Sequence, residues 1–427
     1  MIKLLLPGIK LKRWLLIFFL GIIGLVIFIA TAFAEELASF FTLLSQQLTG
    51  LARLPIHKYS PKLFLEIFLF ILSIALIIFG VRGIISYLIE ALIPEKRGRI
   101  WSLLYRHSDL ARAPNIVVIG GGTGLNSILA GLKRFTNNIT AIVSVSDEGG
   151  SSRKLRYEFG VLPPGDIRNC IVALSDSGPT MAKLLEYRFK EGEGLKGHSF
   201  GNLLITALTR ITGSFDRAIK ETGRILAIRG KVLPVTLAQT RLCAVLENGK
   251  TIEEEPNVEA HKIKYKSEIK RLFLKPANAK AYPEALNEIK KADIIVLGPG
   301  SLYTSILPNL LVKGIPDAIK SSKAKKVYIC NVMTQPGETD NYAASDHVGK
   351  IVKYLGKGVL DYVVVNSERA TQKLYEKYSK EGSARVKIDE ENLDKLDVNV
   401  IKADLLTKEN LLRHDPDKLA KVVLKLV

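Results

Sequence analysis

The stretch NIVVIGGGTGLNSILAGLKRF, residues 115–135, combines an apolar run, a glycine cluster and a helical pattern. Asn115 to Ile119 predicts a buried strand, and Leu125 to Phe135 predicts a helix. A strand that leads through glycines into a helix brings backbone N–H groups and the positive end of the helix dipole together. The turn consists of Gly120, Gly121, Gly122, Thr123 and Gly124. It predicts a phosphate-binding loop, although a glycine-rich turn without a ligand would have the same pattern.

The rest of the chain after Pro114 alternates between β-branched runs and helical patterns. This alternation predicts a Rossmann-like α/β fold, a mainly parallel sheet with helices on both faces. Further strands are expected at residues 139–145, 293–297, 326–331, 362–366 and 398–401. Residues 232–275 differ, because Asn248-Gly249 is a hairpin signal between weakly alternating flanks, so this segment predicts a small β-rich insertion.

Two apolar stretches precede this domain. Residues 14–34 carry no charge and residues 63–81 carry only Glu66, so each is about as long as a helix that crosses a bilayer. Basic residues before the first stretch and after the second predict a transmembrane hairpin with both ends in the cytoplasm. Residues 1–112 would then be a membrane anchor with a basic linker, and residues 114–427 a cytosolic domain. The small residues before Glu35 leave a cleaved signal peptide as the alternative.

The net charge of +19 is distributed unevenly. Residues after Arg112 contain 48 Lys and Arg against 36 Asp and Glu, an excess that suits anionic ligands or an acidic membrane surface. The basic residues are spread out and lack an aromatic-basic module, so we expect no nucleic-acid partner. Cys170, Cys243 and Cys330 form no CxxC pair and have no zinc-type histidine spacing, so we expect buried thiols and no metal cluster.

Polar motifs follow two of the predicted strands or loops. Asp147 ends the second strand, about where a dinucleotide-binding fold places an acid on a ribose hydroxyl, and a helix cap is the alternative. In LPPGDIRNC, the residues Asp166, Arg168 and Asn169 are expected at a helix start. Arg168 could bind phosphate oxygens, and Asp166 could cap the helix or hold a magnesium ion. A capped helix with a surface arginine would also explain this motif.

Later motifs add further candidates. In GHSFGNLLITAL, His198 and Asn202 are four residues apart and share a face if both are helical, although local capping or packing is the alternative. DIIVLGPGSLYTSILPNLL repeats the first pattern, with Gly298, Gly300 and Ser301 in the loop. Two such loops on one sheet edge could bind the two ends of a diphosphate-linked ligand. The polar run from Asn331 follows another strand, at the edge where open α/β sheets bind ligands.

Several collinear motifs, including IVVIGGGTGL, LPPGDIRNC, GHSFGNLL, GPGSLYTSILPNLL and LLRHD, closely resemble the bacterial gluconeogenesis factor family. The resemblance runs from about Asn115 to the end of the chain. It implies a protein that binds UDP-sugars such as UDP-N-acetylglucosamine and is linked to cell-envelope morphogenesis and cell shape. It also implies that Arg413 and Tyr378 lie on the UDP-sugar surface. Asp147-Glu148 stands where the family usually has paired aspartates, and Arg153 where it usually has glycine.

The combined prediction is a membrane-tethered, cytosolic UDP-sugar-binding regulator that couples carbon supply to envelope synthesis. We assign no catalytic residue, because the sequence shows no evident nucleophile–base pair. Through the related 2-phospho-L-lactate transferases, the resemblance also implies an alternative, a transferase that uses a nucleotide-activated substrate with magnesium. A nicotinamide-dependent dehydrogenase would depend on the glycines alone. We expect a homo-oligomer, and the sequence does not identify a regulatory protein partner.

Overall fold

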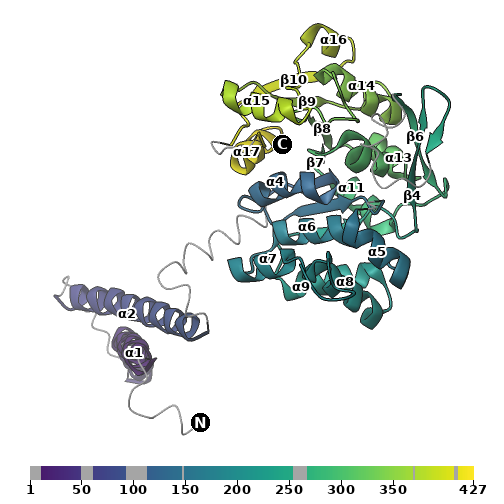
Figure 1. The fold of residues 1–427 in the computed structure, drawn as a ribbon. Helices are drawn as coiled ribbons and strands as arrows, with labels where there is room; N and C mark the ends of the chain where they lie inside the picture. The colour runs from purple at the N-terminus through teal and green to yellow at the C-terminus, as the bar shows by residue number, and fades with distance from the viewer. Residues whose placement is uncertain are drawn as a thin grey trace. The chain divides into compact units, whose positions relative to one another are not determined.

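The computed structural model describes residues 11–49, 61–92, 113–146, 149–252, 267–368, 371–407 and 412–427. The chain divides into two compact units, Met1–His107 and Ser108–Val427 (Figure 1). Each unit is described by itself below.

The first unit contains two long apolar helices, α1 (Leu11–Thr49) and α2 (Pro61–Leu92). Within them, Leu11–Thr31 and Leu65–Tyr87 have the length and hydropathy needed to cross a membrane. These segments overlap the stretches predicted from the sequence at residues 14–34 and 63–81. The two helices could therefore span a membrane.

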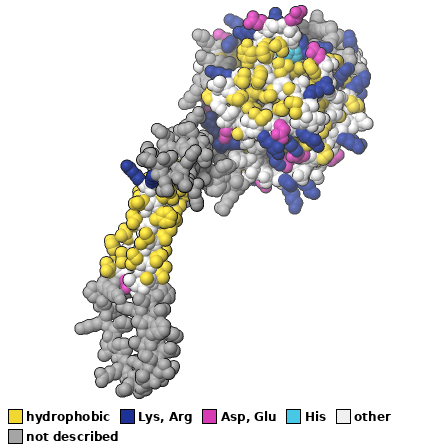
Figure 2. Space-filling model, turned by 90° about the horizontal axis from the view of Figure 1, so that it is seen from below, with side chains coloured by type: hydrophobic (Ala, Val, Ile, Leu, Met, Phe, Trp, Pro, Cys, Tyr) yellow, Lys and Arg dark blue, Asp and Glu magenta, His cyan; other side chains and the backbone are white. Residues whose placement is uncertain are grey.

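Small residues allow α1 and α2 to pack closely. A Cβ atom added at Gly80 would lie 2.8 Å from the Phe18 backbone, so only glycine allows this approach. The outward side chains include Leu16, Phe19 and Ile78, each more than half exposed. Figure 2 shows this apolar surface along the hairpin. An apolar exterior around a glycine-mediated contact is typical of helices in lipid.

A seven-stranded sheet forms the centre of the second unit. In spatial order its strands are β10 (Asn399–Ala403), β9 (Tyr362–Asn366), β8 (Lys325–Ile329), β7 (Ile294–Leu297), β1 (Ile116–Gly120), β2 (Ile139–Val143) and β3 (Lys231–Pro234). All neighbouring strands are parallel, which confirms the predicted Rossmann-like fold. The chain runs outward from β1 to β3 and then returns to β7, so the strand order reverses between β1 and β7. In open α/β sheets, ligands bind at such a reversal, beyond the carboxyl ends of the strands.

Helices cover both faces of this sheet (Figure 1). One group consists of α4 (Gly122–Leu132), α5 (Gly150–Phe159), α6 (Gly165–Leu174), α7 (Pro179–Glu186), α8 (Phe200–Thr212), α9 (Phe215–Ile225) and α17 (Pro416–Leu424). The other includes α11 (Pro283–Lys291), α12 (Leu307–Leu310), α13 (Ile315–Ser321), α14 (Ala344–Leu355) and α16 (Glu390–Asp394). In the first group α4 packs on α6 and α17, and in the second α13 packs on α11 and α14. Right-handed crossovers that run in opposite directions from β1 and β7 place the two groups on opposite faces.

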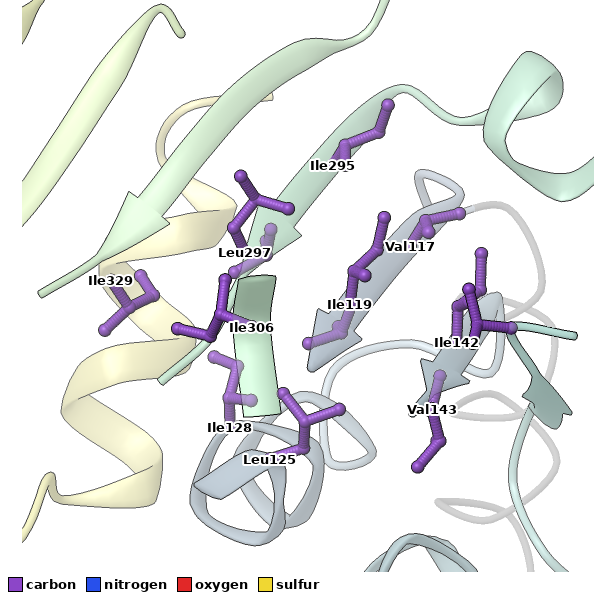
Figure 3. Packing of buried hydrophobic residues seen from close by; sticks show 14 of the residues in the cluster. Val117, Ile119, Leu125, Ile128, Ile142, Val143, Ile295, Leu297, Ile306 and Ile329 are labelled. Carbon is purple, nitrogen blue, oxygen red and sulfur yellow. The ribbon is translucent and has the colours of Figure 1, made fainter. Parts of the chain in front are cut away.

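The core lies on either side of the central strands. Every residue of β1, β2 and β7 is buried, as expected for parallel strands covered on both faces. Figure 3 shows Ile119 of β1 between Val143 of β2 and Leu297 of β7. The three cysteines are buried and free, as predicted. Burial raises the pKa of the Cys330 thiol to about 12, so this group is a neutral core residue.

A small antiparallel sheet forms the predicted β-rich insertion. Its strands are β4 (Arg241–Leu246), β5 (Thr251–Ile252) and β6 (Ile269–Lys275), with β4 in the middle. Gly249 has a φ of +83° in the turn between β4 and β5, which confirms the Asn-Gly hairpin. The predicted start at residue 232 needs correction, because β3 pairs with β2 in the main sheet and its Val232 and Leu233 are buried there. The insertion begins after Pro234.

Candidate functional site

A cleft with a volume of about 1220 Å³ lies beyond the carboxyl ends of the strands, where their order reverses. One wall contains Thr123, Gly124, Asn126 and Ser127 after β1, Ser146 and Gly149 after β2, and Asp166 and Asn169 in α6. The floor contains Pro299, Gly300, Ser301, Thr304 and Ser305 after β7, and Asn331 to Gln335 after β8. The other wall contains Tyr378, Leu412, Arg413, His414, Asp415 and Lys418. Most of the residues predicted to bind a ligand therefore surround one cavity.

The first glycine loop leads directly into α4, which begins at Gly122, earlier than the predicted Leu125. A Cβ atom at Gly122 would lie 2.1 Å from the carbonyl oxygen of Asp166, and one at Gly124 would lie 2.2 Å from the carbonyl oxygen of Pro299. These glycines therefore allow α4 to touch both α6 and the second loop. Thr123 and Gly124 line the cleft, whereas Gly120, Gly121 and Gly122 do not.

The second glycine loop is held by its neighbour Asn331. The Asn331 side-chain amide donates to the Gly300 carbonyl at 2.8 Å and accepts from the Gly300 N–H at 3.3 Å. Gly298 has a φ of +76° and Gly300 a φ of +151°, conformations that favour glycine. Gly300 lines the cleft, while Gly298 lies outside the cleft lining.

Ser301 caps the helical turn that follows, η3 (Leu302–Ile306), by accepting from the Thr304 N–H at 3.1 Å. The same hydroxyl donates to a carboxylate oxygen of Glu338 at 2.5 Å. Glu338 is buried. It belongs to the polar run from Asn331 that the sequence places at the ligand-binding edge of the sheet. The short contact fixes Ser301, which lines the cleft.

A buried polar network lies behind the first wall. Ser151 Oγ contacts His198 Nδ1 at 3.1 Å and accepts from the Asn202 amide at 3.1 Å. The Arg168 guanidinium donates to Asn202 Oδ1 at 3.2 Å and to Ser199 Oγ at 2.5 Å. His198 lies before α8, which Ser199 caps, so His198 and Asn202 do not share a helix face but meet at Ser151. Burial lowers the pKa of His198 and favours its neutral form.

This network extends to the cleft through Asn169. The Arg168 guanidinium donates to Asn169 Oδ1 at 2.6 Å, and the Asn169 amide donates to Thr123 Oγ1 at 3.2 Å. Asn169 and Thr123 line the cleft, but Arg168, His198 and Asn202 do not. Arg168 therefore holds Asn169 in the cleft wall, and Asn202 holds Arg168 from behind.

Asp166 lies in the first turn of α6 and lines the cleft. The cap position of this helix is Pro164 and has no side-chain cap, so Asp166 is not the helix cap considered above. One carboxylate oxygen of Asp166 would lie 2.9 Å from a Cβ atom at Gly121, which places it against the first loop. Within the described part of the chain, no group of three or more His, Cys, Asp or Glu side chains could hold a metal ion.

Asp147 lies outside the described residues, and its predicted role on a ribose stays a prediction. Its described neighbours Ser146 and Gly149 line the cleft. Arg153, at the position where the resembling family has glycine, lies within α5 with its guanidinium 5.7 Å from the centre of the Tyr157 ring. Arg153 is not among the cleft-lining residues.

The wall opposite the first loop comes from α15 (Gln372–Lys380) and the segment before α17. The Tyr378 hydroxyl accepts from the Leu412 N–H at 3.2 Å, and Leu412 belongs to a small buried cluster with Val332. The neighbouring Arg413 is exposed, and within the described residues its guanidinium has no hydrogen bond or ion pair. Arg413 therefore presents a positive charge to the cleft.

Sequence reasoning missed several other cleft residues. His414 follows Arg413 and is buried, and this burial lowers its pKa to about 4. Its Nε2 atom has no hydrogen-bond partner in the described structure. Asn126 and Ser127 lie in the first turns of α4 and line the cleft. They were missed because they fall within the predicted apolar helix after the glycine loop. Lys418 also lines the cleft, and its ammonium group pairs with Asp404 at 2.6 Å.

The chain matches known proteins over most of its length. The family described as 2-phospho-L-lactate transferase CofD matches residues 116–406. The gluconeogenesis factor of Bacillus subtilis is 45% identical, over 74% of this chain and 99% of that protein. A relative from Clostridium acetobutylicum, which carries the same name provisionally, is 45% identical over 99% of this chain and 90% of its own length. A crystal structure of a UPF0052 family member from Bacillus halodurans has a TM-score of 0.70 and 47% identity, and it aligns with 73% of this chain and 99% of its own.

These matches define a class of protein with a CofD-type, Rossmann-like domain. The chain belongs to the CofD family, and within it to the gluconeogenesis factor group. The resemblance inferred from the sequence motifs is thereby confirmed.

Proposed function

We propose that the protein is a regulator whose cleft binds a UDP-sugar, with UDP-N-acetylglucosamine as the expected ligand. One observation supports this most strongly. The first turn of α4, the second glycine loop and Arg413 all border one cavity of about 1220 Å³ at the reversal of strand order. A cavity of this size is large enough for a nucleotide-linked sugar, since ligand-binding pockets typically have volumes of roughly 300–1,000 Å³.

The diphosphate is assigned to the region between the two loops. Thr123 and Gly124 lie at the amino end of α4, where backbone N–H groups and the helix dipole favour an anion. Gly300 and Ser301 face the same space from the second loop. Arg413 supplies a positive charge that can bind phosphate oxygens in a fork.

The uridine and the sugar need uncharged hydrogen-bonding groups. Asn126, Ser127, Thr334 and Gln335 provide amides and hydroxyls along the cleft wall and floor. Such groups bind ring carbonyls and hydroxyls by neutral hydrogen bonds, each of which contributes about 1 kcal/mol. The cleft thus offers charged contacts at its centre and neutral contacts along its length.

Calorimetric titration of UDP-N-acetylglucosamine tests this assignment. Arg413→Ala should weaken binding by roughly tenfold or more, because a hydrogen bond to a charged group is worth about 1.5–3 kcal/mol. Arg224→Ala is the matched control, since this exposed arginine lies on α9, outside the cleft lining. Equal loss in both variants, or no binding by the wild type, would reject the assignment.

A transferase is the second candidate function, and the position of Asp166 favours it. This carboxylate lies in the cleft beside the first loop, and the matching family is described as a transferase. A carboxylate there could help to place a magnesium ion beside a diphosphate. Product formation from a guanylyl-linked phospholactate and a deazaflavin acceptor, with loss of turnover in Asp166→Asn, would favour the enzyme. An unchanged UDP-sugar and an Asp166→Asn variant that still binds it would favour the regulator.

The proposed regulator is held at the membrane by its hairpin, with the large domain in the cytoplasm and a role in cell shape and envelope synthesis. Supporting this, the two apolar helices are flanked by basic residues at their outer ends, and the Clostridium acetobutylicum relative aligns along 99% of the chain, the helices included. After replacement of the native cysteines, a Thr49→Cys variant should react with an impermeant thiol reagent added outside intact cells. Reaction only after lysis would contradict the hairpin.

A further inference from the structure

Three hydroxyl side chains line the cleft close to the second glycine loop, those of Ser301, Thr304 and Ser305. Two of them use their hydroxyl hydrogen inside the protein. Ser301 donates to Glu338 at 2.5 Å, and Thr304 donates to Ser301 at 2.6 Å. Ser305 differs, because its Oγ atom makes no hydrogen bond within the described residues. The Ser305 hydroxyl can therefore donate to a ligand in the cleft without the loss of an internal contact.

The backbone of Ser305 is held in place at both of its polar groups. Its N–H donates to the Ser301 carbonyl at 3.0 Å, and its carbonyl accepts from the Asn309 side-chain amide at 2.7 Å. The same amide donates to the carbonyl of Gly120, at the end of β1, at 3.3 Å. Asn309 is fully buried, so these bonds are shielded from water. Ser305 thus has a fixed backbone, and only its side-chain hydroxyl is unused.

The Ser305 side chain lies between the two glycine loops. A Cβ atom added at Gly121, in the first loop, would lie 2.5 Å from Ser305 Oγ, so Ser305 occupies the space that a side chain at Gly121 would need. A Cβ atom at Gly300, in the second loop, would lie 3.9 Å from the same oxygen. Ser305 therefore adjoins both loops, at the reversal of strand order between β1 and β7.

Asp166 restricts how an anion can approach this hydroxyl. One of its carboxylate oxygens would lie 2.9 Å from the Cβ atom at Gly121, so a negative charge lies against the first loop beside Ser305. Like charges repel, and a phosphate oxygen would therefore contact Ser305 on the side of Gly300, away from Asp166. Thr123 and Gly124, at the amino end of α4, supply the favourable dipole on that side of the cleft.

We propose that Ser305 is the side-chain donor that binds the diphosphate where the two loops meet. This inference rests on the proposed function, because it names a donor for the diphosphate of that ligand. A hydroxyl that donates to an ionised phosphate forms a charge-assisted hydrogen bond, which is stronger than a neutral one. Ser301 has a different role, since its hydroxyl hydrogen is committed to Glu338 and fixes the loop.

Calorimetric titration with UDP and with inorganic pyrophosphate tests the role of Ser305. The globular unit, residues 113–427, is suitable because the crystallised relative aligns over 99% of its own length with only 73% of this chain. Ser305→Ala should weaken the binding of both probes about tenfold, because a hydrogen bond to a charged group is lost. Its melting temperature should stay unchanged, since the hydroxyl makes no internal hydrogen bond. Ser321→Ala is the matched control, an exposed serine outside the cleft, and it should bind both probes as the wild type does.

The outcomes separate this inference from the proposed function. If Ser305→Ala binds UDP and pyrophosphate like the wild type, or if its melting temperature falls, the role of Ser305 is rejected and the proposed function stands. A loss of affinity for UDP-N-acetylglucosamine but not for UDP would place Ser305 on the sugar and would also overturn the inference. Pyrophosphate binding that depends on Ser305, in a protein that does not bind UDP-N-acetylglucosamine, would support Ser305 and reject the UDP-sugar. A wild type that binds none of the three compounds would overturn both.

Discussion

The two glycine loops have the same sequence pattern but differ in what surrounds them. In the first loop, a Cβ atom at Gly122 or Gly124 would collide with backbone atoms of α6 or of the second loop. In the second loop, the nearest atom to a Cβ at Gly300 would be 3.5 Å away, at ordinary contact distance. Gly122 and Gly124 therefore allow close packing inside the protein, whereas Gly300 allows an unusual backbone conformation at the cleft surface.

The difference shows that a glycine cluster after a strand predicts a close backbone approach, and that the approaching group can be protein as well as ligand. In this fold both occur together. The first loop brings α4 against the second loop, and the two then form adjoining parts of one cleft. Gly120, Gly121 and Gly122 pack behind the cleft wall, where Thr123 and Gly124 are exposed to the cavity. Ligand binding by these three glycines stays a prediction.

Gly122→Ala, in the first loop, should cause the largest loss of stability. The added methyl carbon would lie 2.1 Å from the backbone carbonyl oxygen of Asp166. A backbone atom cannot move aside as the flexible end of a side chain could. Overpacking of this kind should lower the free energy of unfolding by about 3 kcal/mol, measured by urea titration of the globular unit, residues 113–427. Gly150→Ala is the control, because nothing lies within 4 Å of its added Cβ atom. Similar stability of both variants would show that the first loop is not a packing contact.

The second-largest effect on stability should come from His414, in the cleft wall that faces both loops. Burial lowers the pKa of His414 to about 4, below the ordinary value of roughly 6.5. As pH falls below about 6.5, His414 becomes protonated in the unfolded chain before it does in the folded chain. The stability that neutral His414 gives the folded state at pH 7 is therefore lost progressively until about pH 4. The loss from this residue should reach about 3 kcal/mol. Unfolding titrations at pH 7 and pH 4.5 should show a shallower pH dependence for His414→Gln than for the wild type, and equal slopes would contradict the assignment.

The sequence was sufficient to predict six of the seven strands of the main sheet and the hairpin turn at Asn248-Gly249, because buried parallel strands and turn residues leave local patterns. The seventh strand, β3, was assigned to the β-rich insertion because it is short and adjoins that segment. The sequence also predicted a candidate site at the strand ends, where the cleft lies. It was not sufficient to distinguish Arg168 from Arg413. Both are arginines in polar motifs, but tertiary contacts turn Arg168 toward Ser199 and leave Arg413 exposed in the cleft. Such contacts join residues far apart in the chain, so no local pattern records them.

In the second loop, Gly300→Ala should have a moderate effect of a different origin. The cleft has room for the methyl group, but the φ of +151° is a conformation that residues with a Cβ atom rarely adopt. We expect a loss of about 2 kcal/mol in the free energy of unfolding, together with weaker UDP-sugar binding. Unchanged binding despite the lower stability would place the ligand away from this loop.

The smallest effect should come from Ser301→Ala, which removes the cap of η3 and the contact with Glu338. Loss of a serine cap lowers stability by about 1 kcal/mol. Thermal denaturation should show this decrease, and Ser321→Ala, near the end of α13 and outside the cleft, should change less. A larger loss in the control would show that the Ser301 cap does not stabilise the second loop.

The most direct measurement is a crystal structure of the globular unit with UDP-N-acetylglucosamine. We expect a diphosphate between Thr123 and Gly300, within hydrogen-bonding distance of backbone N–H groups in both loops, with the Arg413 guanidinium on a phosphate oxygen. Ligand density elsewhere on the unit, or density in the cleft with the diphosphate turned away from both loops, would contradict diphosphate binding by the two glycine loops.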